Sequence, residues 1–236
     1  MQNKVKDKVV VITGASSGIG KAIAKELAKN GVKVVLGARR KNQLENIVDE
    51  IHNNNGEGVF LETDVTKRND VINLVDLALK TFGQLDVIVN NAGISELGRM
   101  DELDVEGWNK MIDVNLKGVL YGMAAAIPVF KRQNSGHIIN IISTSGIKIV
   151  PMQGVYAATK NAVRTIAEAF RQESDGAIRI TGISPGFVKT GLVDEMKNQE
   201  MKKIIPESIA NAVIYAISQP KNVEVGDIII RPSAQN

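Results

Sequence analysis

The stretch that decides the fold is residues 9–20, VVVITGASSGIG, near the start of the chain. Four consecutive apolar, β-branched residues are typical of a strand that is buried on both faces. A glycine-rich loop follows at once, and residues 19–30 have the apolar spacing of a helix. A buried strand, a tight glycine turn and a helix, in this order, form the first unit of a βαβ fold.

The same alternation continues along the 236 residues of the chain. Short runs rich in Val and Ile predict strands, and the longer amphipathic stretches between them predict helices. The expected strands are 8–13, 32–38, 58–62, 85–90, 137–143, 178–184 and 225–231. The expected helices are 19–30, 42–54, 69–82, 105–127, 155–174 and 206–218. This order predicts a single α/β domain over residues 1–236, a doubly wound Rossmann fold with a mostly parallel seven-stranded sheet and helices on both faces.

Composition excludes several classes of site and partner. The chain has no cysteine and only two histidines, His52 and His137, so we expect no disulfide, no metal site and no Ser-His-Asp triad. The net charge of +3 comes with no dense basic patch, which argues against nucleic-acid binding. No apolar run reaches the roughly 18 residues of a membrane span, and Pro128 interrupts the nearest one, residues 118–130. We therefore expect a soluble, cytoplasmic protein without a membrane segment.

The glycine-rich loop predicts a binding site for a phosphate group. In a doubly wound sheet, ligands bind beyond the carboxyl ends of the strands, where this loop lies. Gly14 allows the tight turn, Gly18 lets the backbone approach a pyrophosphate, and Gly20 lets helix and strand pack closely. The helix that follows offers free N–H groups and a partial positive charge. The spacing differs from G-x-G-x-x-G, and a glycine turn without a ligand is the alternative.

The end of the second expected strand indicates which dinucleotide would bind. A site for NAD carries Asp or Glu about 20 residues after the glycine motif, to bind the ribose 2′-hydroxyl. This chain has Arg39 and Arg40 there and no acid. Guanidinium groups suit a 2′-phosphate, so NADP is the predicted cofactor. A solvated surface pair beside Lys41 is the alternative.

A third feature is a tyrosine and a lysine that share one helix face. Tyr156 and Lys160 are four positions apart, and Ser143 precedes them at the end of an expected strand. A free tyrosine has a pKa near 10, too high for efficient proton transfer at neutral pH. A neighbouring cation favours the phenolate, and Lys160 can supply that charge. Ser143 could hydrogen-bond the same reacting oxygen.

Together these motifs resemble the short-chain dehydrogenase/reductase family over about residues 5–231. Further matches are Asp64-Val65, Asn90 to Gly93, Asn115, Pro185-Gly186 and Thr190. The resemblance implies Ser143, Tyr156, Lys160 and Asn115 as the catalytic residues. It implies NADP(H) binding by Gly14, Ser16, Ser17, Gly18, Ile19, Gly20, Arg39, Arg40, Asp64, Val65, Asn91, Ala92, Gly93, Tyr156, Lys160, Pro185, Gly186, Val188 and Thr190.

The resemblance also implies roles for the catalytic residues. Tyr156 would exchange a proton with the oxygen of a small carbonyl compound, or of the matching secondary alcohol or hydroxy acid. Ser143 would hold that oxygen, Lys160 would bind the nicotinamide ribose, and Asn115 would anchor a water for a proton relay. Family members form homodimers or homotetramers through the helices expected at 105–127 and 155–174.

The substrate is less well determined. We expect a mostly apolar pocket lined by Ile94, Ile147, Val150, Met152, Gln153, Phe187, Leu192 and Met196, with residues 191–206 as a lid or an exposed helix. Residues 225–235, VGDIIIRPSAQ, lack the Asp-Gly-Gly ending of many relatives. They resemble the branch of NADP-dependent serine and 3-hydroxy acid dehydrogenases, which puts a 3-oxoacyl carrier-protein reductase in doubt. An NADP(H)-binding redox sensor with little turnover, and a nucleotide-sugar epimerase or dehydratase, stay open as alternatives.

Overall fold

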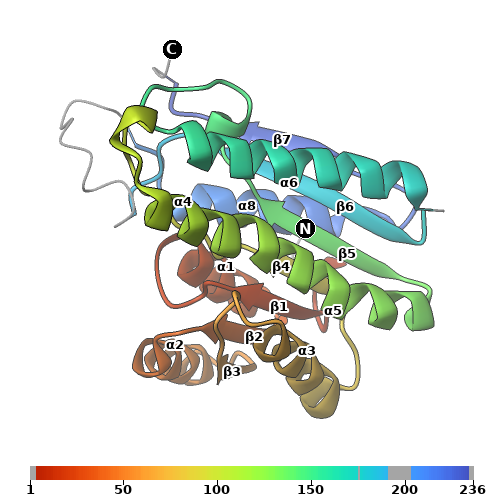
Figure 1. The fold of residues 1–236 in the computed structure, drawn as a ribbon. Helices are drawn as coiled ribbons and strands as arrows, with labels where there is room; N and C mark the ends of the chain where they lie inside the picture. Colours follow the sequence, from red (N-terminus) through yellow and green to blue (C-terminus); the bar gives the residue numbers. More distant parts are fainter. Residues whose placement is uncertain (1–3, 175, 191–202, 234–236) are drawn as a thin grey trace.

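Seven parallel strands form one sheet in the order β3-β2-β1-β4-β5-β6-β7 (Figure 1). The computed structural model describes residues 4–174, 176–190 and 203–233. The strands are β1 (Val9–Thr13), β2 (Lys33–Ala38), β3 (Gly58–Glu62), β4 (Val87–Asn90), β5 (Gly136–Ile141), β6 (Ile178–Pro185) and β7 (Asp227–Ile230). The predicted seven-stranded doubly wound sheet is confirmed, and every strand pair in it is parallel.

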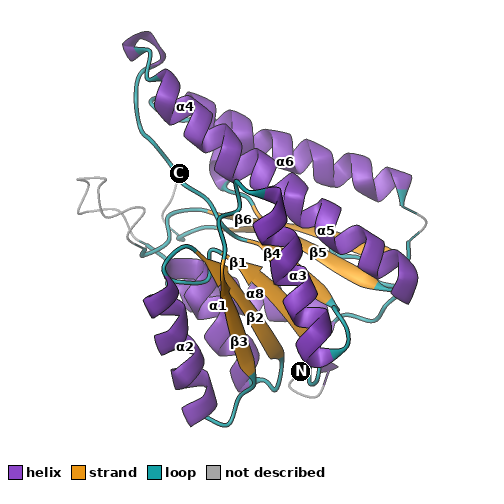
Figure 2. Cartoon of the chain, turned by 60° about the horizontal axis from the view of Figure 1, so that its bottom comes forward, coloured by secondary structure: helices purple, strands orange, loops and turns teal. Residues whose placement is uncertain are grey.

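Helices cover both faces of the sheet (Figure 2). One face carries α1 (Gly18–Lys29), α2 (Lys41–Asn53) and α8 (Pro206–Ser218). The other carries α3 (Arg68–Phe82), α5 (Gly118–Gln133) and α6 (Gly154–Glu173). Along β1, Val10 and Ile12 belong to the first core and Val9 and Val11 to the second. Because both faces are buried, the strands are continuous Val and Ile runs rather than alternating ones.

The topology brings the functional loops to one edge. All strands run in the same direction, so the loops that follow them meet at the carboxyl edge of the sheet. The chain winds outward from β1 to β3 and then returns to place β4 on the other side of β1. The gap between the loops after β1 and β4 is the switch point at which such sheets bind ligands.

The helix predicted over residues 105–127 is longer and less regular than expected. It is made of α4 (Val105–Met111), a π-helical segment η3 (Ile112–Lys117) and α5, and it continues through Pro128 to Gln133. The prediction that this helix ends before Pro128 was therefore wrong. Proline removes one helical hydrogen bond, but Val129 and Phe130 are buried in the core and hold the last turns in place.

This same stretch is long and apolar enough to cross a membrane by length and composition alone. Among the described residues it is the one helix that meets this criterion, with a mean hydropathy of 1.2 over its best window. Val119, Met123 and Phe130 pack into the core against the sheet. The stretch therefore serves as a core helix in this fold.

Candidate active site

The glycine-rich loop is joined tightly to the loop after β4. The side-chain Nδ2 of Asn91 donates to the carbonyl oxygens of Thr13 and Gly14, at 2.9 and 3.2 Å. The Thr13 hydroxyl oxygen accepts from the backbone N–H groups of Asn91 and Ala92, at 3.1 and 3.2 Å. These four hydrogen bonds fix the two loops that border the switch point.

This packing leaves no room for side chains in the loop. A Cβ atom on Gly20 would lie 2.4 Å from the Gly14 carbonyl oxygen, and one on Gly14 would lie 2.7 Å from the Ala92 Cα. Gly14 also has a φ of +65°, which L-residues rarely adopt. The loop thus holds its backbone in a fixed conformation at the amino end of α1, which is where a pyrophosphate cradle is expected. The residues present fit a dinucleotide.

Arg40 lies across the same loop. Its Nη2 donates to the hydroxyls of Ser16 and Ser17, at 2.9 and 2.6 Å, and its Nε donates to Ser16 at 3.2 Å. Arg39 is exposed next to it. The predicted group of two arginines and two serines therefore gathers at one point beside the cradle, where a 2′-phosphate could bind.

Asp64 lies close to these arginines. Burial raises the pKa of its carboxyl, but two hydrogen bonds from Thr66 and the charges of Arg39 and Lys67 lower that pKa by more. The backbone N–H and the hydroxyl of Thr66 donate to Asp64 Oδ1 at 3.0 and 2.8 Å. Asp64 thus stays a carboxylate, which can accept from an amino group such as that of adenine.

Tyr156 and Ser143 meet at the centre of the edge. The tyrosine lies in the first turns of α6, and Ser143 caps η4 (Thr144–Gly146) after β5. Burial raises the pKa of the Tyr156 hydroxyl, and a hydrogen bond with Ser143 lowers it by less. The lowering by Lys160 that the sequence led us to expect is not among the causes, because Lys160 faces another group.

Lys160 is 4% exposed, and its Nζ donates to the Ile141 carbonyl oxygen at 3.0 Å. Burial lowers the pKa of its ammonium group to about 8. The Nζ lies 5.8 Å from the centre of the Tyr156 ring. A Cβ on Gly93 would lie 3.4 Å from both the Lys160 Nζ and the Asn115 Oδ1, so Gly93 keeps the space between them open.

Asn115 is fully buried in the π-helical segment η3. Its Oδ1 accepts from the Ile94 N–H at 2.8 Å, and its Nδ2 donates to the Ile94 carbonyl at 2.9 Å and to the Thr159 hydroxyl at 3.2 Å. The Thr159 hydroxyl in turn donates to the Tyr156 carbonyl at 2.7 Å. Asn115 therefore links the loop after β4 to the helix that carries Tyr156 and Lys160.

The other predicted cofactor residues reach the same edge. A Cβ on Gly18 would lie 3.2 Å from the Thr190 Cγ2, so the segment after β6 closes over the glycine loop. Gly186 donates its N–H to Ile230 at 2.7 Å and Val188 is buried, which anchors that segment. Val65 packs against Gly118 at the start of α5. Pro185 ends β6.

The substrate side of the edge is apolar. Ile147, Val150 and Met152, which were predicted to line the substrate pocket, are exposed after β5, and Leu97 and Met100 are exposed opposite them. The Gly98 N–H donates to the Met152 carbonyl at 3.0 Å and joins the two loops. Leu192, Met196 and most of the expected lid at 191–206 lie outside the described residues.

Two polar residues near this surface are already engaged. Gln153 was expected to face the substrate, but it is 7% exposed and its Oε1 accepts from the Ser145 hydroxyl at 2.7 Å. Arg99, a candidate to bind a carboxylate, makes two hydrogen bonds to Asp101 at 2.8 and 2.6 Å. Both side chains therefore already have partners within the described part of the chain.

Sequence reasoning missed the positioning roles of Thr13 and Thr159. Each hydroxyl links two segments far apart in the chain, and neither belongs to the residues singled out. Their positions in the sequence could have indicated these roles. Thr13 is the last residue of β1, and Thr159 lies between Tyr156 and Lys160. A polar residue at either place is poised to bridge two loops at the carboxyl edge.

The chain belongs to the short-chain dehydrogenase/reductase family, because the family model described as short chain dehydrogenase matches residues 8–201. It is an oxidoreductase of this family, acting on CH–OH groups. Uncharacterized oxidoreductases of Staphylococcus saprophyticus and Listeria monocytogenes are each 45% identical to it. The alignments cover 99% of both chains for the first and 98% of both for the second.

Solved structures agree with this assignment. An alcohol dehydrogenase from the archaeon Thermococcus sibiricus, complexed with 5-hydroxy-NADP, is 36% identical with a TM-score of 0.90, covering 97% of this chain and 98% of that one. A short-chain dehydrogenase/reductase from Burkholderia phymatum, in complex with NAD, is 28% identical with a TM-score of 0.86, covering 94% and 89%. The neighbours thus include complexes with both nicotinamide cofactors.

The buried lysine predicts a pH dependence of stability. The folded-state pKa of Lys160, about 8, lies below that of an unfolded lysine. Below pH 8 both states are protonated and the folded state carries the full burial penalty. Above it, the folded ammonium loses its proton first, so stability is gained. Between pH 8 and 10, wild-type protein should gain about 2 kcal/mol in free energy of unfolding relative to Lys160→Met.

Urea denaturation at several pH values measures this difference. Lys148→Met, at an exposed position, controls for the loss of one positive charge. Parallel stability curves for wild type and Lys160→Met would contradict the buried-ammonium assignment.

Proposed function

We propose that this protein is an NADP(H)-dependent oxidoreductase that interconverts a small carbonyl compound and a secondary alcohol or hydroxy acid. The observation that carries the proposal is the meeting of Ser143, Tyr156, Lys160 and Asn115 beside a glycine cradle at the switch point of the sheet. When bound, the nicotinamide cofactor would supply or accept the hydride.

In this proposal Tyr156 is the general acid and base. Its hydroxyl would give a proton to the carbonyl oxygen during reduction and remove one from the alcohol during oxidation. Ser143, which already hydrogen-bonds Tyr156, would hold the same oxygen and stabilise the charge that develops on it.

Lys160 and Asn115 would supply and replace that proton. The Lys160 ammonium donates to a backbone carbonyl on one side and faces the open space beside Gly93 on the other. A ribose hydroxyl or a water could bind in this space. With a pKa of about 8, Lys160 can gain and lose a proton near neutral pH, which suits a relay. The raised pKa of Tyr156 must fall for catalysis, and a positive charge brought close to it by the cofactor would lower it.

The preference for NADP over NAD rests on Arg39 and Arg40. Arg40 donates to Ser16 and Ser17, and the charge of Arg39 acts on Asp64. A 2′-phosphate would find two guanidinium groups and two hydroxyls there. NAD lacks the 2′-phosphate, so it has no anionic group at this point for the two guanidinium groups to bind.

Replacing Tyr156 by phenylalanine tests the catalytic assignment. Tyr156→Phe should lower kcat by about 10²–10⁴-fold, because it removes the proton donor and leaves the fold intact. NADP⁺ reduction, followed by absorbance with a panel of secondary alcohols and hydroxy acids that includes serine and 3-hydroxybutyrate, measures the loss. Tyr215→Phe, at an exposed position on α8, is the matched control.

Two results would count against this mechanism. Full turnover by Tyr156→Phe would remove the tyrosine from the chemistry. Tight NADPH binding by the wild-type protein with no turnover of any compound, in either direction, would favour the redox sensor.

Replacing the arginines tests the cofactor preference. Arg39→Ser and Arg40→Ser should each weaken NADPH binding by about tenfold or more, because a charge-assisted hydrogen bond is lost. NADH binding should stay unchanged. Fluorescence titration with both cofactors measures the two dissociation constants, and Arg68→Ser, at the start of α3, is the control. An equal loss of affinity for NADPH and NADH would show that the arginines do not bind the 2′-phosphate.

We also infer that the protein is a homodimer or homotetramer that pairs through residues 105–127 and 155–174. Leu120 and Val105 are exposed on this helical stretch, whereas Gly118 and Gly122 are buried against Val65 and Asn90 of the same subunit. Light scattering at micromolar concentration should give a mass at least twice the 25.5 kDa of one chain. A mass of one chain would refute the pairing.

A further inference from the structure

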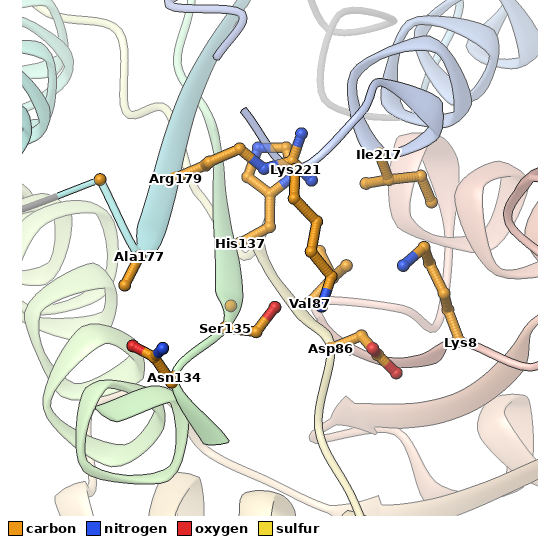
Figure 3. Close-up of a pocket in the computed structure, with 12 residues that line it drawn as sticks. Lys8, Asp86, Val87, Asn134, Ser135, His137, Ala177, Arg179, Ile217 and Lys221 are labelled. Carbon is orange, nitrogen blue, oxygen red and sulfur yellow. The ribbon is translucent and has the colours of Figure 1, made fainter. Parts of the chain in front are cut away.

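A second polar cavity lies at the opposite, amino end of the sheet (Figure 3). It measures about 100 Å³ and is bordered by the starts of β4, β5 and β6, by Lys8 before β1 and by Lys221 after α8. A water molecule takes about 30 Å³ in the liquid. The cavity thus has room for about three waters or for one ion of phosphate size. The proposed reaction uses none of its residues.

Cations dominate the lining. Lys8, Arg179 and Lys221 reach into the same opening from three different elements (Figure 3). Within the described part of the chain, none of the three forms a salt bridge. Asp86 is the one carboxylate among the lining residues, and its Oδ2 already accepts hydrogen bonds from the Val9 N–H and the Gln84 side chain, at 2.8 and 2.7 Å.

One of the three cations, Arg179, already makes hydrogen bonds within the protein. The Arg179 Nη1 donates to the carbonyl oxygens of Gln219, Pro220 and Val223, at 3.4, 3.4 and 3.0 Å, and so binds the chain that leaves α8. Lys8 and Lys221 have no such bonds among the described residues. Their ammonium groups are available to a ligand.

One of the residues that line the cavity, His137, carries a buried hydrogen-bond acceptor. His137 is 1% exposed, and its Nε2 lies 2.8 Å from the Thr181 hydroxyl oxygen. That hydroxyl donates its single hydrogen to the Val225 carbonyl at 2.6 Å, so it must accept from His137 and Nε2 must carry the proton. Burial, with the charges of Arg179 and Lys8, lowers the pKa of His137 to about 3, and the ring stays neutral.

It follows that the second ring nitrogen of His137 is an acceptor. Nδ1 is buried and has no hydrogen-bond partner among the described residues. A ligand that matches this cavity needs negative oxygens for the lysines and one hydrogen to donate to Nδ1. An acceptor-only anion would leave the nitrogen unpaired, which is unfavourable in a buried site.

We propose that this cavity binds a hydrogen-bearing tetrahedral oxyanion, free hydrogen phosphate. Its negative oxygens accept from Lys8, Lys221 and Arg179, and its P–OH group donates to His137 Nδ1. Free phosphate has three ionisable hydrogens, and its second ionisation, at a pKa of about 6 to 7, still leaves one P–OH group at neutral pH. A phosphate monoester has only two such hydrogens and has mostly lost both at pH 7. Sulfate has nearly the same size and charge but carries no hydrogen, so it should bind more weakly.

The ring nitrogens of His137 report on this site directly. The chain has only two histidines, so a His52→Gln variant assigns the His137 signals in a nitrogen-15 NMR spectrum of the imidazole rings. Addition of phosphate at pH 7 should shift the Nδ1 signal as that nitrogen gains a hydrogen bond. Sulfate at the same ionic strength should shift it far less. Phosphate bound in the cofactor cradle at the other edge leaves this signal unchanged.

Variants and a third ligand complete the test. Lys221→Gln should raise the apparent Kd for phosphate about tenfold, whereas Lys110→Gln, on the distant α4, should leave it unchanged. Methyl phosphate, which at pH 7 is mostly a dianion without a P–OH group, should shift Nδ1 far less than free phosphate, and an equal shift would contradict the proposed bond from P–OH to Nδ1. The proposal is overturned if phosphate leaves Nδ1 unmoved, if sulfate acts equally, or if the two lysine variants behave alike.

Discussion

The active edge depends on the hydrogen bonds between the loop after β1 and the loop after β4. The Asn91 side chain donates hydrogen bonds to the carbonyls of Thr13 and Gly14. The Thr13 hydroxyl accepts hydrogen bonds from the backbone N–H groups of Asn91 and Ala92. Gly93 comes next in the chain and faces Lys160 and Asn115. A single run of three residues therefore sets the distance between the phosphate cradle and the groups that move a proton.

The sequence was sufficient to predict the sheet and the place of the site for a clear physical reason. Burial on both faces demands unbroken Val and Ile runs, and the alternation of these runs with helical patterns predicted the parallel strands. Parallel strands in turn bring their following loops to one edge, so Ser143 and Arg40, which follow two of the strands, could be placed at that edge. The family resemblance added Tyr156 to the same site. The spacing of Tyr156 and Lys160 predicted a shared helix face, and both lie at the expected edge.

Features that depend on contacts between distant residues could not be predicted in this way. Pro128 ends a helix by local rules, but core packing by Phe130 carries α5 past it. Gln153 looked free to meet a substrate until Ser145 was found to hold it. The pKa of Tyr156 is raised rather than lowered, because burial outweighs its hydrogen bond and Lys160 is turned to the Ile141 carbonyl. Each of these outcomes is set by tertiary neighbours that no local pattern records.

The π-helical segment η3 has a consequence for how the surface of this protein is built. A π turn holds more residues than an α turn, so it shifts the phase of every side chain that follows by about 100° per extra residue. Asn115 lies within this turn, and the apolar face of α5 begins just after it. The turn therefore sets two things at once: the position of the buried amide, and the direction in which Val119 and Leu120 point. The insertion or deletion of one residue in η3 would therefore move Asn115 and would also rotate the outer face of α5.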